Sequence, residues 1–488
     1  MLFFLTLVPL LAAIVILLGA PARLTALTGG ALAFGVSLLL YARFNPVVSG
    51  FQFVTSVPVS RTLGLNFALG LDGLSLTMIL LSTIVLLAAI WFTGEVAHHE
   101  HSFYASLLLM AGGAIGAFAS LDLFFFYAFH ELALIPTFLL IGIWGTGNRR
   151  AAAWKVTIYL AIGSFVLLLG LIMLYQAVPV ASRSFDLRVL QQAKISATAQ
   201  TPIYLLLLAG FGTLISLVPF HTWAPEAYAS APAPAAMLHA GVLKKFGLYG
   251  LLRLALPILP EAVHAWAHLL LLLLLGNIIY IGLVTIAQRR LDWMLGYSSV
   301  MHMGYIFLGI VSANLLGATG AALLMFAHGL SIALLFALNG EVRKNVPSLN
   351  FDSLGGLAKQ MPIVAFLFGL AAFAAIGLPG FANFPAEIMV FFGAFRTGFD
   401  FDHFHQFQWT TLLALWGVVI SAVYLLRAYR RTFFGTAVAD RPPVRELPYS
   451  LRFPAALLMA TSLYFGFFPQ ALVQKIMPVV RPYFAASR

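Results

Sequence analysis

Six ionisable residues stand inside long apolar runs of this 488-residue sequence. They are Glu131, Lys244, Lys245, His302, His328 and Glu387. A charge at the centre of a lipid-embedded helix costs roughly 2.5–3.5 kcal/mol, so residues of this kind mark ion pathways. Glu, Lys and His side chains can each take up and release a proton in a suitable environment. Their distribution along the sequence therefore predicts stepwise proton movement at membrane depth.

The composition indicates a chain embedded in a membrane. Hydrophobic residues make up 61% of it and charged residues 9%, and the mean hydropathy is +0.97. A soluble domain has about a quarter of its residues charged, so a water-soluble enzyme is excluded. The apolar runs are commonly about 20 residues long, which is the length that a helix needs to cross a bilayer. We expect an all-α polytopic membrane protein with about fourteen transmembrane helices.

The expected helices follow one another from the first residues to the last. Their approximate positions are 2–20, 24–42, 74–94, 102–119, 122–143, 155–176, 202–220, 232–254, 264–286, 291–311, 314–338, 362–395, 408–428 and 450–468. The first run lacks a basic region before it, so we expect a retained helix and no cleaved signal peptide. Lys and Arg favour the loops of one side, which predicts that this side is cytoplasmic. Both termini would then lie on the outer face of the cell inner membrane.

Two segments interrupt the apolar pattern with Pro and Gly. The first is SLVPFHTWAPEAYASAPAP at 216–234, and the second is IGLPGFANFPA at 376–386. Irregular backbone at membrane depth persists only where it is buried in protein or lines a polar cavity. A loop followed by the next helix is an equal alternative for the first segment. The second segment favours a broken helix, because 362–395 is too long for one straight span, and paired broken helices are typical of ion transporters.

Other chemistries find little support in the sequence. There is no Cys, which excludes thiolate-held iron–sulfur clusters, disulfides and cysteine-bound zinc within the chain. The net charge is +11, but the basic residues lie in short loops between apolar runs. They therefore indicate membrane orientation, and we expect no nucleic-acid partner. No glycine-rich phosphate loop and no nucleophile–base pair is present in the loops.

Further polar residues have competing interpretations. Accessory candidates for the proton pathway are His130, Lys155, His221 and His239. A single buried His more often packs than conducts, and a buried Glu beside a buried Lys could be a static pair. His221 and Glu226 lie close to the end of a span, so solvated loop residues are the stronger interpretation for both. Lys244 and Lys245 point about 100° apart on a helix, so only one of them can face Glu131 squarely.

Several segments together resemble the antiporter-like proton-pumping subunits of respiratory complex I. They are FFFYAFHELALIP, PFHTWAPEAYASAPAPAAMLHAGVLKKFGLYGLLR, GYSSVMHMGYIFLGI and HGLSIALLFALNGE. GLDGLSL at 70–76, which holds Asp72, is similar to the start of the third helix of those subunits. The resemblance spans residues 65–430. Within this family the sequence is most similar to the chain M type of bacterial NADH–quinone oxidoreductase, because no long lateral helix of the related L type follows the fourteenth expected span.

The resemblance implies a particular architecture. The family has a fourteen-helix core with two inverted five-helix repeats and discontinuous seventh and twelfth helices. Mapped onto this sequence, it implies an N-terminal three-helix segment at 1–100, a first repeat of helices 4–8 at 101–255, a second repeat of helices 9–13 at 262–430, and a C-terminal loop and helix 14 at 431–488.

The resemblance also implies roles for individual residues. In chain order these are the fifth-helix acid that responds to a neighbouring subunit, Glu131; a basic residue at the start of the sixth helix, Lys155; the central proton carrier, Lys245; the histidines that link the two half-channels, His302 and His328; and the acid at the outlet, Glu387.

Two positions depart from the family pattern. The family places a lysine seven residues before the His of the HxW motif, as partner of the fifth-helix acid, and here that residue is Leu214. Before YSS the family reads Asp-x-Lys, and here the sequence is Arg290-Leu291-Asp292. The partner of Glu131 is then Lys244, which we favour, or His130. Otherwise the subunit gates differently or conducts poorly.

The sequence leaves three classes of function to compare. The leading hypothesis is a translocase subunit without redox chemistry of its own, beside other antiporter-like membrane subunits; flavin, iron–sulfur clusters and quinone are expected in the partner subunits. The second is a subunit of a multisubunit cation/proton antiporter, a membrane-bound hydrogenase or a related assembly, including a carbon-uptake complex. The third is a haem-binding subunit, with ligands drawn from His130, His239, His302 and His328.

Overall fold

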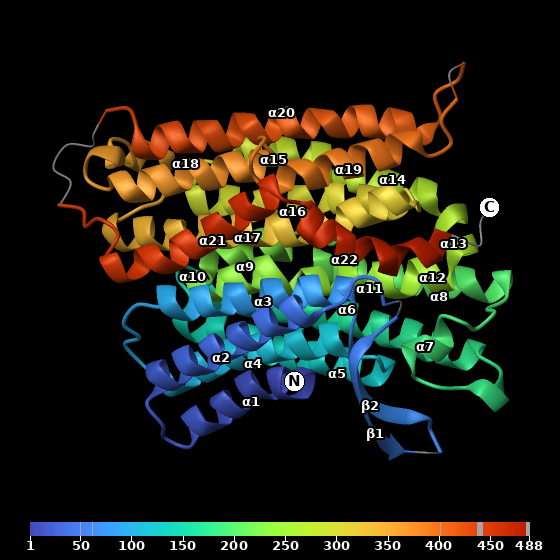
Figure 1. Ribbon diagram of the computed structural model, residues 1–488. Helices are drawn as coiled ribbons and strands as arrows, with labels where there is room; N and C mark the ends of the chain where they lie inside the picture. Colours follow the sequence, from blue (N-terminus) through green and yellow to red (C-terminus); the bar gives the residue numbers. More distant parts are fainter. Residues whose placement is uncertain (49, 61, 401, 437–442, 485–488) are drawn as a thin grey trace.

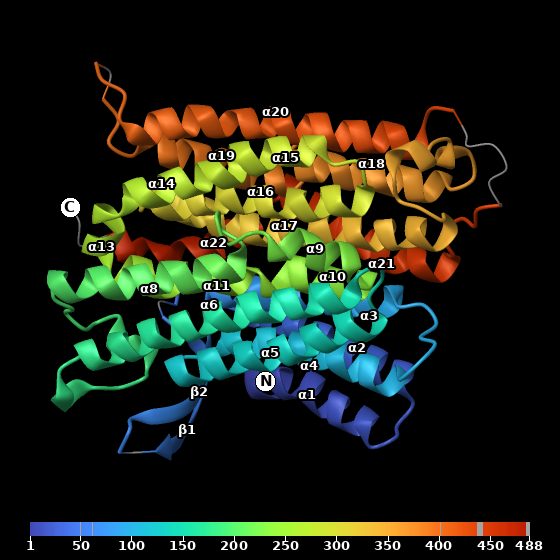
Figure 2. The ribbon, with the colours of Figure 1, turned by 180° about the vertical axis from the view of Figure 1, so that it is seen from behind.

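The computed structural model describes residues 1–48, 50–60, 62–400, 402–436 and 443–484. Figure 1 shows long helices lying side by side with roughly parallel axes, from α1 at one edge to α20 at the opposite edge. Figure 2 shows the opposite face, on which α5, α6 and α8 are neighbours. The polar residues predicted to conduct protons come from the helices between these two edges.

The helices before the first break are α1 (Leu2–Leu17), α2 (Ala22–Arg43), α3 (Gly73–Phe92), α4 (Glu100–Ala119), α5 (Leu123–Trp144), α6 (Arg149–Ala177), α7 (Leu187–Leu190) and α8 (Ala197–Ile215). Those that follow are α9 (Trp223–Ser230), α10 (Ala233–Leu238), α11 (Lys245–Gly250), α12 (Leu256–Ile258), α13 (Pro260–Ala265), α14 (Ala267–Leu275), α15 (Ile281–Ala287), α16 (Leu291–Val311), α17 (Leu315–Asn345), α18 (Pro362–Ile376), α19 (Asn383–Arg396), α20 (Gln406–Phe433), α21 (Tyr449–Phe467) and α22 (Gln470–Val480).

The membrane class predicted from composition is confirmed. Among the described residues, ten helices are long and apolar enough to cross a bilayer, or eleven if the bent pair α21 and α22 counts as one span. The other expected spans are shorter, as in α1 and α18, or are interrupted, so the number fourteen stays a prediction. The inverted repeats and the four segment boundaries also stay predictions.

The membrane helices divide into a buried core and a perimeter. α3 and α17 are buried along the whole of their apolar windows, and α16 along 94% of its window. α6 instead exposes a stripe of large apolar side chains on its outer side: Trp154, Ile158, Ile162, Phe165 and Leu169. Helices that are apolar all round and buried by their neighbours form the centre of a membrane bundle. The core helices are therefore shielded from lipid, whereas α6 faces outward.

Both predicted interruptions are confirmed. α8 ends at Ile215 and α9 begins at Trp223, while α18 ends at Ile376 and α19 begins at Asn383. The first break is held by the buried side chain of Asn277, whose amide nitrogen donates to Ser216 O at 3.2 Å. Its amide oxygen accepts from Val218 N at 2.8 Å. Because no water in the hydrocarbon could satisfy these backbone groups, a buried amide stabilises the open helix end.

The structure contains two elements that the sequence did not predict. Residues 44–73 were assigned no regular structure, but β1 (Gln52–Ser60) and β2 (Leu65–Leu71) pair as an antiparallel hairpin. After α21 the chain bends by 70° and forms α22. The apolar residues of α22 recur at helical spacing and are buried: Leu472, Val473, Ile476 and Val480. The helix packs against α3 by this face and was missed because it is shorter than a membrane span.

The helix that carries the adjacent lysines contains a wide turn. α10 continues through η2 (His239–Leu243), a π-helical turn in which Lys244 N donates to His239 O at 3.0 Å, into α11. Such turns are rare and occur frequently at functional sites. The η2 turn meets α17 where two glycines face each other, because a Cβ on Gly329 would lie 2.7 Å from Gly241 O. Only glycine permits this close approach.

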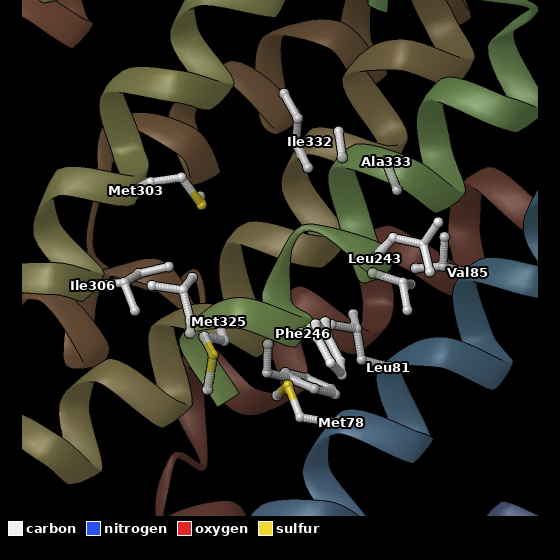
Figure 3. Close-up of a cluster of buried hydrophobic side chains, with 14 of the residues drawn as sticks. Met78, Leu81, Val85, Leu243, Phe246, Met303, Ile306, Met325, Ile332 and Ala333 are labelled. Atoms are coloured by element: carbon white, nitrogen blue, oxygen red, sulfur yellow. The ribbon is translucent and has the colours of Figure 1, made fainter. Parts of the chain in front are cut away.

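Apolar side chains surround the lysines on the same helix. Figure 3 shows Leu243 and Phe246 pointing toward Met78, Leu81 and Val85 of α3. Leu243 and Phe246 flank the lysine pair directly in the sequence. The two charged side chains therefore enter a densely packed hydrocarbon interior, in which any polar contact that they make is energetically important.

A second buried charge lies at the far end of this helix. Arg253, in the π-helical turn η3 (Leu251–Ala255), donates to both carboxylate oxygens of Asp72, at 2.6 and 2.7 Å. Asp72 also caps α3 by accepting from Ser75 N at 3.0 Å. Tyr249 OH and Tyr483 OH accept from the same guanidinium, at 3.2 and 3.4 Å. The bidentate pair therefore ties α3 to this helix and to the C-terminal segment.

We predict that Asp72→Asn destabilises the fold by about 3–5 kcal/mol, because it leaves the Arg253 guanidinium buried without its counter-charge. Thermal unfolding of the purified membrane complex measures this, and the melting temperature should fall. The matched control is Asp402→Asn in the exposed loop before α20, which should melt like the unaltered complex. Equal melting temperatures for the two variants would contradict the stabilising role of the pair.

Candidate functional site

Lys245 and His328 form a direct contact between two core helices. The Lys245 ammonium lies at the start of α11, fully buried, and its Nζ is 3.0 Å from His328 Nδ1 on α17. Lys245 also donates to the carbonyl oxygen of Ala240, five residues back in the wide turn. The separation between Nζ and Nδ1 is a hydrogen-bond distance, so a proton can pass between these two groups without an intermediary.

His302 continues the line from His328 toward the second helix break. The two imidazole rings have centroids 5.5 Å apart. His302, on α16, places Nδ1 2.8 Å from Ser298 O and Nε2 2.8 Å from Ala375 O. Ala375 is in the last turn of α18, where carbonyls lose their helical partners. The histidine therefore connects the centre of the bundle to the broken helix.

Glu387 lies immediately beyond that break. Its carboxylate is buried on α19, and Oε1 has no hydrogen-bond partner among the described residues. Gly377, in a left-handed conformation with φ +83°, leaves room for it, because a Cβ there would lie 2.2 Å from Glu387 Oε2. Tyr305, whose hydroxyl is also without a described partner, has its ring centroid 5.8 Å from that of His302. Tyr305 therefore lies beside His302, at the start of the path toward α19.

Lys244 points to a different set of groups. Its Nζ donates to Ser299 O at 3.2 Å and lies 3.4 Å from Ser299 Oγ, on α16. The same ammonium is 5.5 Å from the centre of the Tyr228 ring, on α9. Tyr228 OH in turn lies 3.2 Å from His239 Nδ1. Lys244 therefore faces α16 and α9, while Lys245 faces α17.

The predicted pairing of Glu131 with Lys244 or His130 is wrong. The Glu131 carboxylate, on α5, accepts a hydrogen bond from Ser164 Oγ of α6. His130, the preceding residue, points the other way and stacks on Phe246 with ring centroids 3.9 Å apart. Phe246 also stacks on Phe126, with centroids 4.4 Å apart. Successive helical residues diverge by about 100°, so Glu131 and His130 point to different neighbours.

The expectation of a solvated loop residue is wrong for His221, whereas Glu226 lies on a helix and stays partly exposed. Glu226, on α9, forms an ion pair with Lys155 of α6, with Oε2 2.9 Å from Nζ. His221 is buried, and its Nδ1 has no described hydrogen-bond partner. Only His221 is enclosed by its surroundings, a placement that local sequence position does not reveal. Lys155 therefore has a structural partner and does not contact the other candidates.

The second departure from the family pattern forms an ion cluster at the end of α16. Asp292, fully buried, accepts from Arg290 Nη2 at 2.8 Å and from Arg343 Nη2 at 3.0 Å. The hydrogen bonds to Asp292 raise the pKa of the Arg290 guanidinium above its ordinary value. The cluster connects α16 to α17, and its residues are separate from the contacts that His328 and His302 make.

Several contacts of the site were missed from the sequence. Ser164, Tyr228, Ser299 and Tyr305 are uncharged, so a search for ionisable residues in apolar runs passes over them. A polar hydroxyl is common in membrane helices, and only the assembled packing shows which hydroxyls meet a charge. The signal available for Tyr228 was its place in the AYASAP segment of the first break.

Two of the histidines considered as haem ligands have other hydrogen-bonding neighbours in the structure. Both ring nitrogens of His302 face backbone carbonyls, and Nδ1 of His239 faces a tyrosine hydroxyl. In the described part of the chain, no group of three His, Cys, Asp or Glu residues could hold a metal ion. The geometry instead supports hydrogen bonding and proton transfer between side chains.

Comparison with known proteins identifies the class. A family model described as "NADH:quinone oxidoreductase/Mrp antiporter, TM" matches residues 120–412. The chain is 38% identical to NAD(P)H-quinone oxidoreductase chain 4 1 of Synechococcus elongatus, over 90% of this chain and 82% of that protein. It is 34% identical to NADH-quinone oxidoreductase subunit M of Rhodobacter capsulatus, over 94% and 90% of the two chains.

A solved structure agrees over the whole length. A chain of respiratory complex I from Thermus thermophilus with bound NADH superposes with a TM-score of 0.90 at 28% identity, covering 99% of both chains. This chain therefore belongs to the NADH:quinone oxidoreductase/Mrp antiporter membrane family, as the sequence resemblance indicates. It is a multi-pass membrane protein similar to subunit M and chain 4 of these oxidoreductases.

We predict that Gly377→Ala displaces the Glu387 carboxylate and lowers proton translocation. The matched control is Gly380→Ala, in the same break and also at positive φ, where an added Cβ meets its nearest neighbour at 3.5 Å. Both variants carry about 1–2 kcal/mol of backbone strain, but only the first clashes with the carboxylate. Proton uptake by membrane vesicles is the measurement, and equal loss in both variants would contradict the proposed contact.

Proposed function

We propose that this chain is a proton-translocating membrane subunit, of the chain M type, in an NADH–quinone oxidoreductase. Electron transfer in other subunits would drive it, with flavin, iron–sulfur clusters and quinone held there and no redox cofactor in this chain. The single observation that carries the proposal is the contact of buried Lys245 with His328, continued by His302 toward Glu387. The family membership of the chain supports it.

In the proposed mechanism Lys245 is the central carrier. Its ammonium donates a proton to His328 Nδ1, which lies within hydrogen-bond distance. Transfer on to His302 crosses the 5.5 Å between ring centroids by ring motion or through water, and Glu387 receives the proton beyond the break. Moving one charge against 100 mV requires about 2.3 kcal/mol. A single change in the neighbouring charges is therefore of the right size to drive one step.

Lys244 is a second proton-binding residue, which receives the proton before Lys245. Neither lysine forms an ion pair with a carboxylate among the described residues, and their contacts run to different helices. Two like charges in a protein interior repel each other, and the repulsion grows as the local dielectric constant falls. The pair therefore favours holding one proton at a time, received at Lys244 beside the first break and delivered from Lys245 to His328.

Glu131 has a peripheral position that suits a response to a neighbour. It lines a cavity of about 440 Å³ between α5 and α6, with apolar residues such as Ile135, Leu160 and Ala161. A charged group from an adjacent subunit would act strongly on a carboxylate in such surroundings. Glu131 would then transmit the state of the neighbour through the electric field, without direct contact with the lysines.

The proposed location is the cell inner membrane, with both termini on the outer face. The excess of Lys and Arg in the loops of the opposite side supports this orientation. The partners would be adjacent antiporter-like subunits and the other membrane subunits of the complex. On this proposal the enzyme is the assembled translocase, and the isolated chain is not catalytic.

A cation/proton antiporter, a membrane-bound hydrogenase or a related assembly is the alternative. The matching family description itself names both the oxidoreductase and the Mrp antiporter. The subunits that copurify with this chain discriminate between them: flavin and iron–sulfur proteins support the oxidoreductase, nickel-site proteins a hydrogenase, and neither kind an antiporter.

We predict that Lys245→Met strongly reduces proton translocation by this subunit, because it removes the donor to His328. The reduction should be at least tenfold, as positioned acid–base groups contribute about 10²–10⁴-fold. The measurement is NADH-driven proton uptake into inverted membrane vesicles. Lys194→Met, at an exposed position, is the control with the same loss of charge and should keep normal uptake. Normal uptake in Lys245→Met would refute the central role of this lysine.

We predict a smaller effect for Lys244→Met. Intake should slow by up to roughly tenfold, since the delivering lysine and its histidine remain in place. The same vesicle assay applies, with assembly of the complex checked by its electron-transfer rate to an added acceptor. Normal proton uptake in Lys244→Met, together with lost uptake in Lys245→Met, would show that Lys244 is not part of the proton path.

A further inference from the structure

A polar cavity lies beside the last turns of α20, away from the lysine and histidine line. Its volume is about 430 Å³. The residues that line it come from the end of α15, the segment after it, the segment after α17 and α20: Ile286, Ala287, Gln288, Arg289, Phe351, Asp352, Arg427 and Arg431. None of these residues takes part in the proposed proton path.

The cavity carries a net positive charge. Arg289, Arg427 and Arg431 line it with one acid, Asp352. Asp352 Oδ1 lies 3.6 Å from Arg431 Nη1, and the two side chains are 86% and 49% exposed. An exposed pair at that distance contributes little to stability and leaves both partners accessible. The site therefore presents three guanidinium groups and neutralises at most one of them.

Arg427 contributes its guanidinium to the lining of the cavity. Its Nη2 donates to Gln288 O at 3.0 Å, and its guanidinium carbon lies 5.6 Å from the centre of the Phe351 ring, so two lining residues position this side chain. Guanidinium donors lie in a fixed fork that matches the oxygens of a phosphate group. The chemistry of the lining therefore favours a phosphate-bearing anion.

The surroundings favour an anion attached to apolar chains. α15 and α20 pack against each other and both expose large apolar side chains, including Leu283 on α15 and Val423 and Leu426 on α20. Leu426 directly precedes Arg427, and Val423 lies one helical turn before it. An apolar surface that continues from a basic pocket toward the bilayer matches a phospholipid, with its head group at the arginines.

We propose that this cavity binds the phosphate head group of an anionic membrane phospholipid. The phosphodiester contacts Arg289, Arg427 and Arg431, and the acyl chains lie along the exposed surface of α15 and α20. The site is independent of the proposed proton path, because it shares no residue with it. Free phosphate has the same head-group chemistry, so the test must separate the two sources.

The test uses the purified membrane complex in a neutral detergent. It is titrated separately with dioleoylphosphatidylglycerol, dioleoylphosphatidylcholine and inorganic phosphate, and native mass spectrometry counts the molecules bound to this chain. We expect at least about fivefold tighter binding of phosphatidylglycerol than of phosphatidylcholine. Each of Arg289→Gln and Arg427→Gln should weaken phosphatidylglycerol binding by about fivefold, the contribution of one basic residue at an anionic surface.

The control is Arg430→Gln, which removes the same charge from α20 at a position that does not line the cavity. It should leave the lipid preference unchanged. Equal retention of the two lipids, or undiminished phosphatidylglycerol binding in Arg289→Gln, would overturn the proposal. Arginine-dependent binding of inorganic phosphate without a preference for phosphatidylglycerol would also overturn it and indicate a free-anion site. Arg289 is exposed, so its variant keeps the test valid if Arg427→Gln fails to assemble.

Discussion

The structure depends on two lysine side chains held in a hydrocarbon interior, neither of which forms an ion pair with a carboxylate of the described residues. Lys244 and Lys245 are both fully buried, and their hydrogen bonds run to carbonyl, hydroxyl and imidazole groups. Desolvation of a charge is costly, and neutral dipoles compensate only part of that cost. A group in this condition can change its protonation for a small input of energy. That property is what a proton carrier needs and what a structural ion pair avoids.

The rest of the fold keeps this unstable arrangement in place. Gly241 and Gly329 bring the lysine helix against α17, which places Lys245 in contact with His328. At the far end of the same helix, Arg253 is the opposite case: a buried charge with a bidentate partner, which fixes the helix instead of titrating. The Arg253–Asp72 pair holds the helix that carries Lys245 in a fixed position. Small changes in the electric field can then act on the protonation of Lys245.

The sequence alone predicts the membrane class, both helix breaks and the charged residues of the proton line, because each of these has a local signal. Apolar runs reveal spans, and Pro and Gly reveal the breaks before α9 and α19. The contacts between side chains of different helices could not be predicted in this way. Glu131 was expected to pair with Lys244, yet it bonds Ser164, since the direction of a side chain depends on helix rotation. α22 and the β1–β2 hairpin were missed because short elements resemble loops in composition.

A proton path through this chain requires water or mobile side chains that connect His328, His302 and Glu387 across the second break. The most direct measurement is a density map of the assembled complex, at a resolution that shows ordered water, in the region between α16, α17 and α19. We expect water molecules bridging His302 and Tyr305 to the Glu387 carboxylate, whose Oε1 has no described protein partner. A dry, closely packed barrier between His302 and Glu387 in every state of the complex would contradict a proton path through this chain.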